Sequence, residues 1–171
     1  MKKLTIAIIL GLLSIGCFAQ QDEYKATIFG IRSDGITDNT ASIQRAVDFI
    51  SEKGGGKLVF YVGRYFTGSV ELKDNVTIDL REAAVLVGAT NIYYYKGAPA
   101  LLWAKDRKGV GVIGKGVIEG RHAALKANIE DQKAKGYLSE NVDIPALTSF
   151  VGCEDAVLGP EVKLIENIVT K

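Results

Sequence analysis

Hydrophobic residues between positions 38 and 53 recur at the spacing of an α-helix. An Asp34-Gly35 pair ahead of them is typical of a turn, and Thr37 or Asp38 can cap the free amides of a first helical turn. Three consecutive glycines, residues 54–56, then end the periodic segment. The pattern therefore predicts a helix over residues 38–53 with one apolar, buried face. That face consists of Ile43, Ala46, Val47 and Ile50.

After the glycines the hydrophobic period changes from 3.6 to about two residues, which indicates that a strand follows the helix. Short apolar runs then recur, each bounded by Gly, Asn or Asp. Strands this short cannot form a free sheet, but stacked coils can bury them against the coils above and below. The chain is therefore expected to be a solenoid. Its predicted strands are residues 57–62, 69–72, 76–80, 83–87, 100–104, 110–113 and 117–119.

The strand rhythm is interrupted between His122 and Asp143. Residues 122–135 predict a helix or helical loop that ends near Gly136 and projects from the stack. Strand composition returns at residues 144–151, a turn is expected at 152–155, and residues 161–168 predict the next edge. No capping element is recognisable after that edge, so we expect a fragment or truncated gene product. Such an edge would expose Leu164 and Ile168 and favour self-association.

The first half of this pattern resembles the opening of the polygalacturonases, which are glycoside hydrolases of family 28, and of the epimerase-like pectate lyases. The similar residues are 28–47, which include Ser33-Asp34-Gly35-Ile36-Thr37-Asp38-Asn39-Thr40, together with 54–56, 63–68 and 72–78. Further on, Gly114-Lys115-Gly116-Val117-Ile118-Glu119-Gly120 resembles a Gly-x-Gly-x-Ile-Asp-Gly run of the family. The resemblance covers residues 26–120 well and 144–168 loosely.

The resemblance implies an all-β fold, the right-handed parallel β-helix, with the early helix as a cap across its first coil. It also implies hydrolysis of pectin-like, galacturonate-containing polysaccharides. The chain departs from the family at three places. Glu119 replaces the family's Asp, Tyr61 or Val62 stands where Pro is common, and residues 121–124 replace an aromatic-rich segment.

Hydrolysis of a glycosidic bond generally requires two carboxylates, one on each side of the scissile bond. The resembling family supplies them in Asn-x-Asp, Asp-Asp, Gly-His-Gly and Arg-x-Lys motifs, and this sequence has no Asp-Asp, Gly-His-Gly or Arg-x-Lys. Asn141-Val142-Asp143 fits the first motif but precedes the strand that should come before the catalytic coils, so a loop turn is favoured. Glu154-Asp155 is likewise favoured as a turn. We therefore assign no catalytic residue.

The aromatic residues between positions 93 and 103 are the strongest candidates for contact with a sugar ring. Trp103 and the run Tyr93-Tyr94-Tyr95 offer flat faces for stacking. The alternative, which we favour, is that Trp103 fills the interior of the coil and that the tyrosines pack under an exposed loop, residues 88–99. Residues that bind substrate therefore stay unassigned from the sequence.

Other chemistry-bearing residues have simple structural interpretations. His122 is the single histidine of the chain and is expected to be a hydrogen-bonding group, since no carboxylate partner is evident. Gly114-Lys115-Gly116 lacks the full spacing of a phosphate-binding loop and predicts a turn. Cys153 is expected to be a small buried residue within a coil. Metal-ligand spacing of Cys and His is absent, so no metal or cofactor is predicted.

The N-terminus has the pattern of an export signal. Lys2 and Lys3 precede an apolar run over residues 4–13, and Ala19 provides the small residue that a signal peptidase requires. We expect residues 1–19 to be a signal peptide that is cleaved near Ala19, with lipidation of Cys17 as the alternative. Residues 20–171 are then expected to be the N-terminal part of a pectate lyase-like β-helix domain, exported to the periplasm or the medium. The run is too short to be a membrane anchor.

Charge adds little to this picture. The chain has 21 basic and 20 acidic residues and no basic stripe, which argues against nucleic acid as a partner. Two functions therefore remain open. The first is the N-terminal segment of a secreted glycoside hydrolase with an acidic, pectin-like substrate, inactive by itself. The second is a non-catalytic β-helix module that binds carbohydrate or serves as a structural base.

Overall fold

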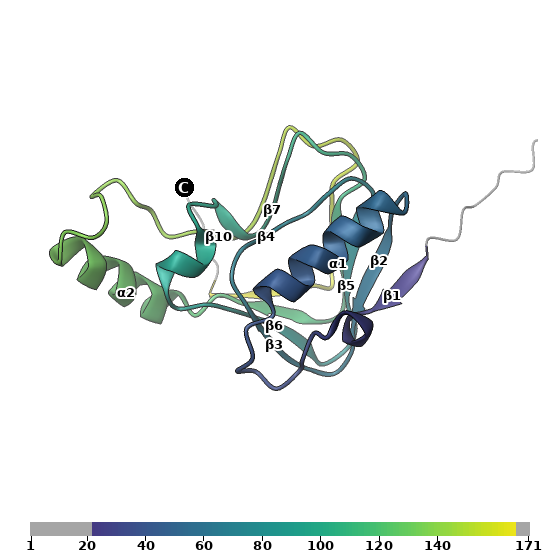
Figure 1. The fold of residues 1–171 in the computed structure, drawn as a ribbon, viewed down its shortest axis with the longest axis horizontal. Coiled ribbons are helices and arrows are strands. Elements are labelled where there is room, and N and C mark those ends of the chain that lie inside the picture. Colours follow the sequence, from purple (N-terminus) through teal and green to yellow (C-terminus); the bar gives the residue numbers. More distant parts are fainter. Residues whose placement is uncertain (1–21, 167–171) are drawn as a thin grey trace, which may run out of the picture.

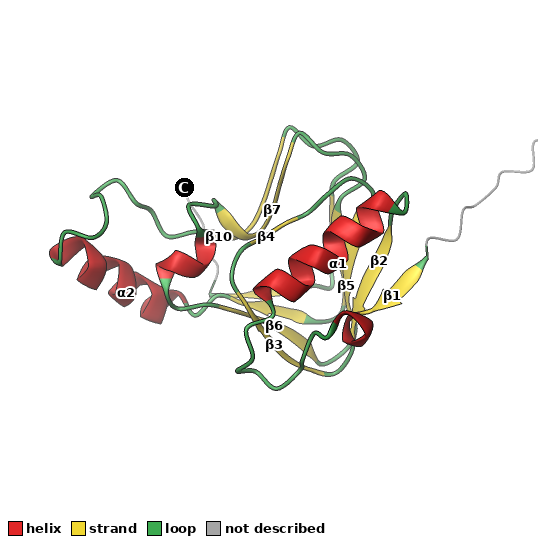
Figure 2. Cartoon of the chain, in the orientation of Figure 1, coloured by secondary structure: helices red, strands yellow, loops and turns green. Residues whose placement is uncertain are grey.

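A computed structural model describes residues 22–166 of the chain. The predicted signal peptide, residues 1–19 with Cys17, and Ile168 of the predicted last edge lie outside the described part. Within that part, short strands stack in parallel into three sheets around one core (Figures 1 and 2). Sheet A has the order β1-β2-β5-β8-β11, sheet B the order β12-β9-β6-β3, and sheet C the order β10-β7-β4. Their bounds are β1 Glu23–Lys25, β2 Gly56–Phe60, β3 Gly63–Thr67, β4 Val70–Glu71, β5 Val76–Leu80, β6 Ala84–Gly88, β7 Ala100–Lys105, β8 Gly111–Gly114, β9 Val117–Glu119, β10 Ala146–Val151, β11 Val157–Leu158 and β12 Lys163–Ile165. The helices are η1 Ala26–Phe29, α1 Thr40–Glu52, η2 Ile92–Tyr95 and α2 His122–Ala134.

Each coil passes once through the three sheets before the next coil begins, as the predicted solenoid requires. Leu58, Ile78 and Val112 occupy the same register in successive coils of sheet A, and all three are buried. Parallel crossovers of this kind are right-handed. The fold is the right-handed parallel β-helix that the sequence predicted.

Strand bounds agree with the prediction to within a few residues, and β5 and β9 agree completely. The predicted first strand was too long. Tyr61 and Val62 lie beyond β2 and are exposed, because the chain turns there to enter sheet B as β3. The pattern analysis also did not predict β1, β3 or β11 as strands. β1 and β11 have only two or three residues, and β3, residues 63–67, lies between the predicted strands 57–62 and 69–72.

The amphipathic helix α1 covers the N-terminal end of the coil (Figure 1). Its four predicted apolar residues are at most 1% exposed. The helix begins at Thr40, and its N-cap residue Asn39 makes no side-chain capping bond. Asp38 Oδ1 accepts a hydrogen bond from the Thr40 amide at 2.9 Å, whereas Thr37 bonds Asp34. The predicted cap over the first coil is therefore confirmed. The buried face is Ile43, Ala46, Val47 and Ile50.

The residues that lead into α1 form a turn held by side chains. Asp34 accepts hydrogen bonds from the amides of Ile36 and Thr37 and from the Thr37 hydroxyl. Together these bonds, with the Thr37 hydroxyl the largest contributor, lower the pKa of Asp34 to about 2. The buried Asn39 bonds both main-chain groups of Arg32, at 2.8 and 2.9 Å. The motif shared with the polygalacturonases is thus structural in this chain.

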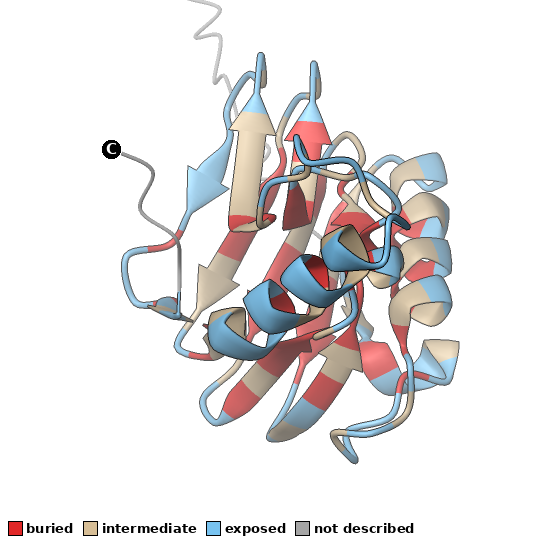
Figure 3. Cartoon of the chain, turned by 90° about the vertical axis from the view of Figure 1, so that its left-hand side faces the viewer, coloured by how far each residue is buried: buried red, intermediate tan, exposed pale blue. Residues whose placement is uncertain are grey.

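Helix α2 projects from the coil, as predicted for this interruption (Figures 1 and 3). In Figure 3 it lies in front of the coil, and most of its surface is exposed. Leu125 and Ile129 are buried on the face that it turns to η2 and the coil. No helix within residues 22–166 has the length and apolar character needed to span a membrane.

Candidate functional site

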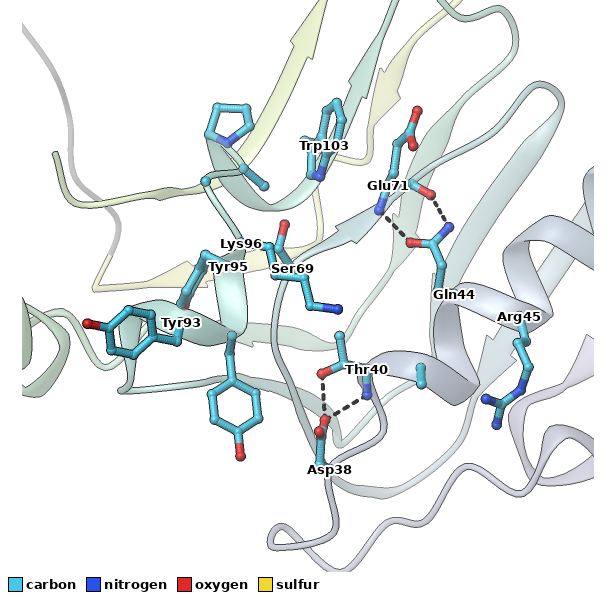
Figure 4. Close-up of a pocket in the computed structure, with 15 residues that line it drawn as sticks. Asp38, Thr40, Gln44, Arg45, Ser69, Glu71, Tyr93, Tyr95, Lys96 and Trp103 are labelled. Carbon is cyan, nitrogen blue, oxygen red and sulfur yellow. Dashed lines mark hydrogen bonds between the residues drawn. The ribbon is translucent and has the colours of Figure 1, made fainter. Parts of the chain in front are cut away.

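A cleft of about 940 Å³ opens between α1, the outer face of sheet C, and the loop that connects β6 to β7 (Figure 4). We call residues 88–99, which contain η2, the tyrosine loop. Residues from four segments line the cleft. They are Asp38, Thr40, Ala41, Gln44 and Arg45 near α1, Ser69 and Glu71 near β4, Tyr93 to Pro99 in the tyrosine loop, and Trp103 on β7.

The floor of the cleft is a row of outward side chains on sheet C. Glu71 of β4 pairs in register with Trp103 of β7, which in turn pairs with Ser149 of β10. Trp103 is half-buried and lines the cleft. Our expectation that Trp103 fills the coil interior was wrong. Its neighbours Leu102 and Ala104 are the buried residues, and alternation along the strand turns Trp103 outward.

The carboxylate of Glu71 is held in its charged form by two basic side chains. Lys73 Nζ lies 2.5 Å and an Arg107 amino group 3.0 Å from its carboxylate oxygens. Burial by itself would raise the pKa of Glu71, but the hydrogen bonds from Lys73 and Arg107 outweigh burial and hold the pKa below its usual value. Glu71 therefore stays ionised at neutral pH, which does not suit a proton donor to a leaving group.

The tyrosine loop forms the opposite wall, and its three tyrosines differ. Tyr95 is buried, as expected, and its hydroxyl donates to the Ala89 carbonyl at 3.1 Å; burial raises its pKa to about 12. Tyr93 is 51% exposed, so the prediction that it packs under the loop was wrong. Tyr94 is half-buried and packs edge-on against Phe66 at 5.7 Å between ring centroids.

Lys96 is the cleft residue that sequence reasoning missed. It ends η2 in the left-handed conformation, with φ of 51°, and its side chain extends toward the middle of the cleft in Figure 4. Within the described part of the chain, Lys96 has no ion pair with a carboxylate. No sequence motif marks this lysine, because only the fold brings it opposite Trp103.

The two candidate catalytic motifs considered from the sequence, Asn141-Val142-Asp143 and Glu154-Asp155, lie outside the cleft. Asn141 and Asp143 are exposed in the loop before β10, where they line a second hollow of about 660 Å³ on the far side of the tyrosine loop. Glu154 and Asp155 form the predicted turn after β10, and Glu154 lies 3.6 Å from Lys108 Nζ. Asn141 and Asp143 share this second hollow with Tyr93, Tyr95 and Lys96, whereas Glu154 and Asp155 line neither hollow.

The remaining candidates also have structural surroundings. His122 Nε2 lies 3.4 Å from the Pro145 carbonyl oxygen. The amides of Lys115 and Gly116 both donate to the Leu80 carbonyl at 2.9 Å, so they are not free to bind phosphate. Cys153 was expected to be buried but is only half-buried, because it lies in the turn that leaves β10. Among residues 22–166 no group of three His, Cys, Asp or Glu is placed to hold a metal ion.

Chemically, the cleft combines a large aromatic face, a flexible ammonium group and several hydroxyl and amide groups. Aromatic faces stack on the apolar faces of sugar rings, and an unpaired ammonium can form a charge-assisted hydrogen bond with a carboxylate. The arrangement suits a ligand that is both ring-shaped and anionic.

Known proteins resemble this chain in sequence and in fold. No family model matches it. The exo-poly-α-D-galacturonosidase of Dickeya chrysanthemi is 31% identical over 62% of the chain and 21% of that protein. The crystal structure of a "putative glycosyl hydrolase" from Parabacteroides merdae is 51% identical, with a TM-score of 0.80 over 84% of this chain and 64% of that one.

A more distant likeness concerns the fold alone. The exopolygalacturonase of Thermotoga maritima is 22% identical, with a TM-score of 0.67 over 85% of this chain and 42% of that one. The chain thus spans about a fifth of its curated relative and less than two thirds of these solved structures. The chain is therefore a right-handed parallel β-helix that is similar in sequence to an exo-poly-α-D-galacturonosidase and to a glycosyl hydrolase, and similar in fold to an exopolygalacturonase.

Proposed function

We propose that this chain supplies a substrate-binding wall to a secreted glycoside hydrolase that degrades acidic, pectin-like polysaccharides. The 51% identity to a glycosyl hydrolase from Parabacteroides merdae and the 31% identity to an exo-poly-α-D-galacturonosidase support this class of function. Both likenesses cover only part of those proteins, so the complete reaction is part of the proposal.

The single observation that carries the proposal is that Trp103 and Lys96 line the same cleft. Trp103 offers its indole face to a sugar ring, and Lys96 offers a positive charge to the carboxylate of a uronate. The side-chain amide of Gln44 is bonded to the main chain of Glu71, and the Glu71 carboxylate is bonded to Lys73 and Arg107, so these groups do not compete for the ligand.

Cleavage is assigned to acids other than those in the described cleft. A glycosidase requires one carboxyl that can donate a proton and a second that activates water or attacks. In the cleft, Glu71 is tied to Lys73 and Arg107, and Asp38 accepts hydrogen bonds from the amide and hydroxyl of Thr40. Both carboxylates are therefore occupied by structural partners.

Direct binding tests this assignment. Trp103 is the single tryptophan of the chain, so its fluorescence reports occupation of the cleft. Titration with an oligogalacturonate should change the emission, whereas a neutral galactan oligosaccharide of equal length should bind more weakly.

Variants make the test specific. Calorimetry should show that Trp103→Ala weakens binding of both sugars, and that Lys96→Gln weakens binding of the acidic sugar alone, by about fivefold, as expected for loss of about 1 kcal/mol. Lys105→Gln, an exposed lysine outside the cleft, is the control and should bind as the unaltered chain does. Equal affinity for acidic and neutral sugars would refute the role of Lys96.

The alternative function is a non-catalytic β-helix module that binds carbohydrate or serves as a structural base. The structural engagement of Glu71 and Asp38 favours it. The DNA beyond the codon for Lys171 distinguishes the two, since an open reading frame that continues into Asp-Asp and Gly-His-Gly motifs supports the hydrolase.

We also propose that the chain is exported after cleavage near Ala19, on the strength of the N-terminal charge and apolar run. Intact-mass measurement of the protein recovered from the producing cells tests this. A mature N-terminus at Gln20 is expected, and a lipidated Cys17 would show the alternative route.

A further inference from the structure

Helix α2 presents a mixed polar and apolar stripe to the tyrosine loop. Leu125, Asn128, Ile129 and Gln132 follow at i, i+3, i+4 and i+7 spacing, which places them on one face. Leu125 and Ile129 are buried there. The surface of the helix away from this stripe carries ion pairs such as Lys126 with Glu130 at 3.7 Å.

Three side chains from this segment bond the tyrosine loop at successive points. Arg121 donates two hydrogen bonds to the Gly88 carbonyl, at 2.8 and 3.0 Å. Asn128 Oδ1 accepts from the Ile92 amide at 3.0 Å. The Tyr93 hydroxyl donates to Gln132 Oε1 at 3.1 Å, so this ring is tied to α2 by its outer end.

These bonds act on a part of the loop that needs support. The η2 helix is a single turn, so its first amides have no partner within the helix. The Asn91 side chain satisfies the Tyr93 amide, and Asn128 satisfies the Ile92 amide. Loss of Asn128 would leave the start of η2 without its bond to α2.

The same turn carries the cleft wall. Tyr94 accepts a hydrogen bond from the Ser69 amide at 3.1 Å through its carbonyl, and Gly68 lies so close to that carbonyl that a Cβ there would collide with it. Lys96 follows directly after η2. Any rotation of η2 would therefore move Lys96 relative to Trp103.

We propose that residues 121–134 form a positioning arm, in which Asn128 and Gln132 hold the tyrosine loop so that Lys96 faces Trp103 across the cleft. The arm's effect on affinity rests on the proposed function of the cleft, whereas its effect on the loop does not. Asn128 and Gln132 are positioning residues and do not touch the ligand. Through them, the segment that interrupts the strand rhythm sets how tightly the cleft binds an acidic sugar chain.

Two substitutions at each position separate the hydrogen bond from the shape of the side chain. Asn128→Leu and Gln132→Leu remove the acceptor oxygen, whereas Asn128→Asp and Gln132→Glu keep an acceptor at the same place. Lys126→Ala, on the outer surface of α2, is the matched control. The full chain is used throughout.

The first measurement is hydrogen exchange of the amides of residues 92–96. We expect exchange to become about fivefold faster in Asn128→Leu, to return toward the original rate in Asn128→Asp, and to stay unchanged in Lys126→Ala. Unchanged exchange rates in Asn128→Leu would refute the proposal that Asn128 holds the tyrosine loop, whether or not the cleft binds sugar.

The second measurement is affinity for an oligogalacturonate, followed by Trp103 fluorescence. Asn128→Leu and Gln132→Leu should each weaken binding about fivefold, and the acceptor-retaining variants should restore it. If the unaltered chain binds but the leucine variants bind equally well, the positioning role is wrong while the proposed function stands. If the unaltered chain does not bind the oligogalacturonate, the proposed function is wrong, and so is the arm's role in affinity. The exchange rates alone then decide whether the arm holds the tyrosine loop.

Discussion

The side-chain amide of Gln44 pairs with both main-chain groups of Glu71. Gln44 Nε2 donates to the Glu71 carbonyl at 3.0 Å, and the Glu71 amide donates to Gln44 Oε1 at 2.9 Å. Because β4 is the outermost strand of sheet C, this amide takes the place of a neighbouring strand. An uncovered strand edge would otherwise pair with another chain.

Asn39 likewise forms hydrogen bonds with the outermost strand of sheet B. Its main-chain amide and its Nδ2 both donate to the Phe66 carbonyl of β3, at 3.1 and 3.2 Å. The strand β3 is the outermost strand of sheet B. The segment that covers the first coil therefore satisfies exposed backbone groups as well as apolar side chains.

Replacing Gln44 tests whether its side chain stabilises the exposed edge of sheet C at β4. Gln44→Ala should lower the free energy of unfolding by about 1–3 kcal/mol, since both backbone groups of Glu71 lose their partner. Urea unfolding of this variant and of Glu52→Ala, an exposed residue of the same helix, provides the comparison. Equal stability of the two variants would contradict the edge-cover interpretation.

The buried face of α1 is tested by a charge. Ile43→Asp places a carboxylate without a partner against the first coil and should cost roughly 3–4 kcal/mol of stability. Arg45→Asp puts the same group on the exposed face and should cost far less. Thermal unfolding measures both, and a small effect at Ile43 would show that α1 does not cap the coil.

Because the pKa of Tyr95 is raised, we expect the free energy of unfolding to fall at high pH. Burial raises its pKa from 10.0 to about 12, so its ionisation is less favourable in the folded chain than in the unfolded one. The stabilising contribution is complete below pH 10 and is lost as the pH rises toward 12. It amounts to at most about 3 kcal/mol.

Tyr95→Phe isolates this contribution from that of the lysines. Urea unfolding at pH 8 and pH 11 should show a smaller loss of stability for the variant than for the unaltered chain. The same loss in both proteins would exclude Tyr95 as the titrating group. At pH 8 the variant should be about 1 kcal/mol less stable, because the bond to the Ala89 carbonyl is gone.

The purified chain should not cleave polygalacturonate. Incubation should release neither reducing ends nor unsaturated products, because the carboxylates of the cleft are engaged by structural partners. Clear turnover that is abolished by Asp143→Asn or Asp155→Asn would show that one of these loop and turn residues is catalytic.

Self-association should occur at the opposite end of the coil from α1. The outermost strands there are β10, β11 and β12, and Val157, Leu158 and Ile165 are 42–49% exposed on them. Exposed edges with apolar side chains template pairing with another chain. Sedimentation at tens of micromolar should detect oligomers, and Leu158→Lys should reduce them. A stable folded monomer would instead support a self-contained binding module.

The sequence by itself determined the elements whose signals are local. The face of α1 that contains Ile43 and Ile50 is visible as a 3.6-residue period, and β5 and β9 are visible as apolar runs between turn residues. These signals depend on propensity and on the nearest neighbours along the chain, so they survive without knowledge of the fold. The motif near Asp34 also pointed to the correct family of folds.

The tertiary structure alone decided the cleft. Trp103 points outward because Leu102 and Ala104 on either side of it face the core, and the register of β7 with β4 and β10 places it between Glu71 and Ser149. Lys96 lines the same cleft as Trp103 because it follows η2 in a left-handed conformation. Side chains of α2 hold η2 from about 36 residues further along the chain, as in the Asn128 bond to Ile92. Contacts between residues so far apart depend on how the coils stack, and no local pattern encodes them.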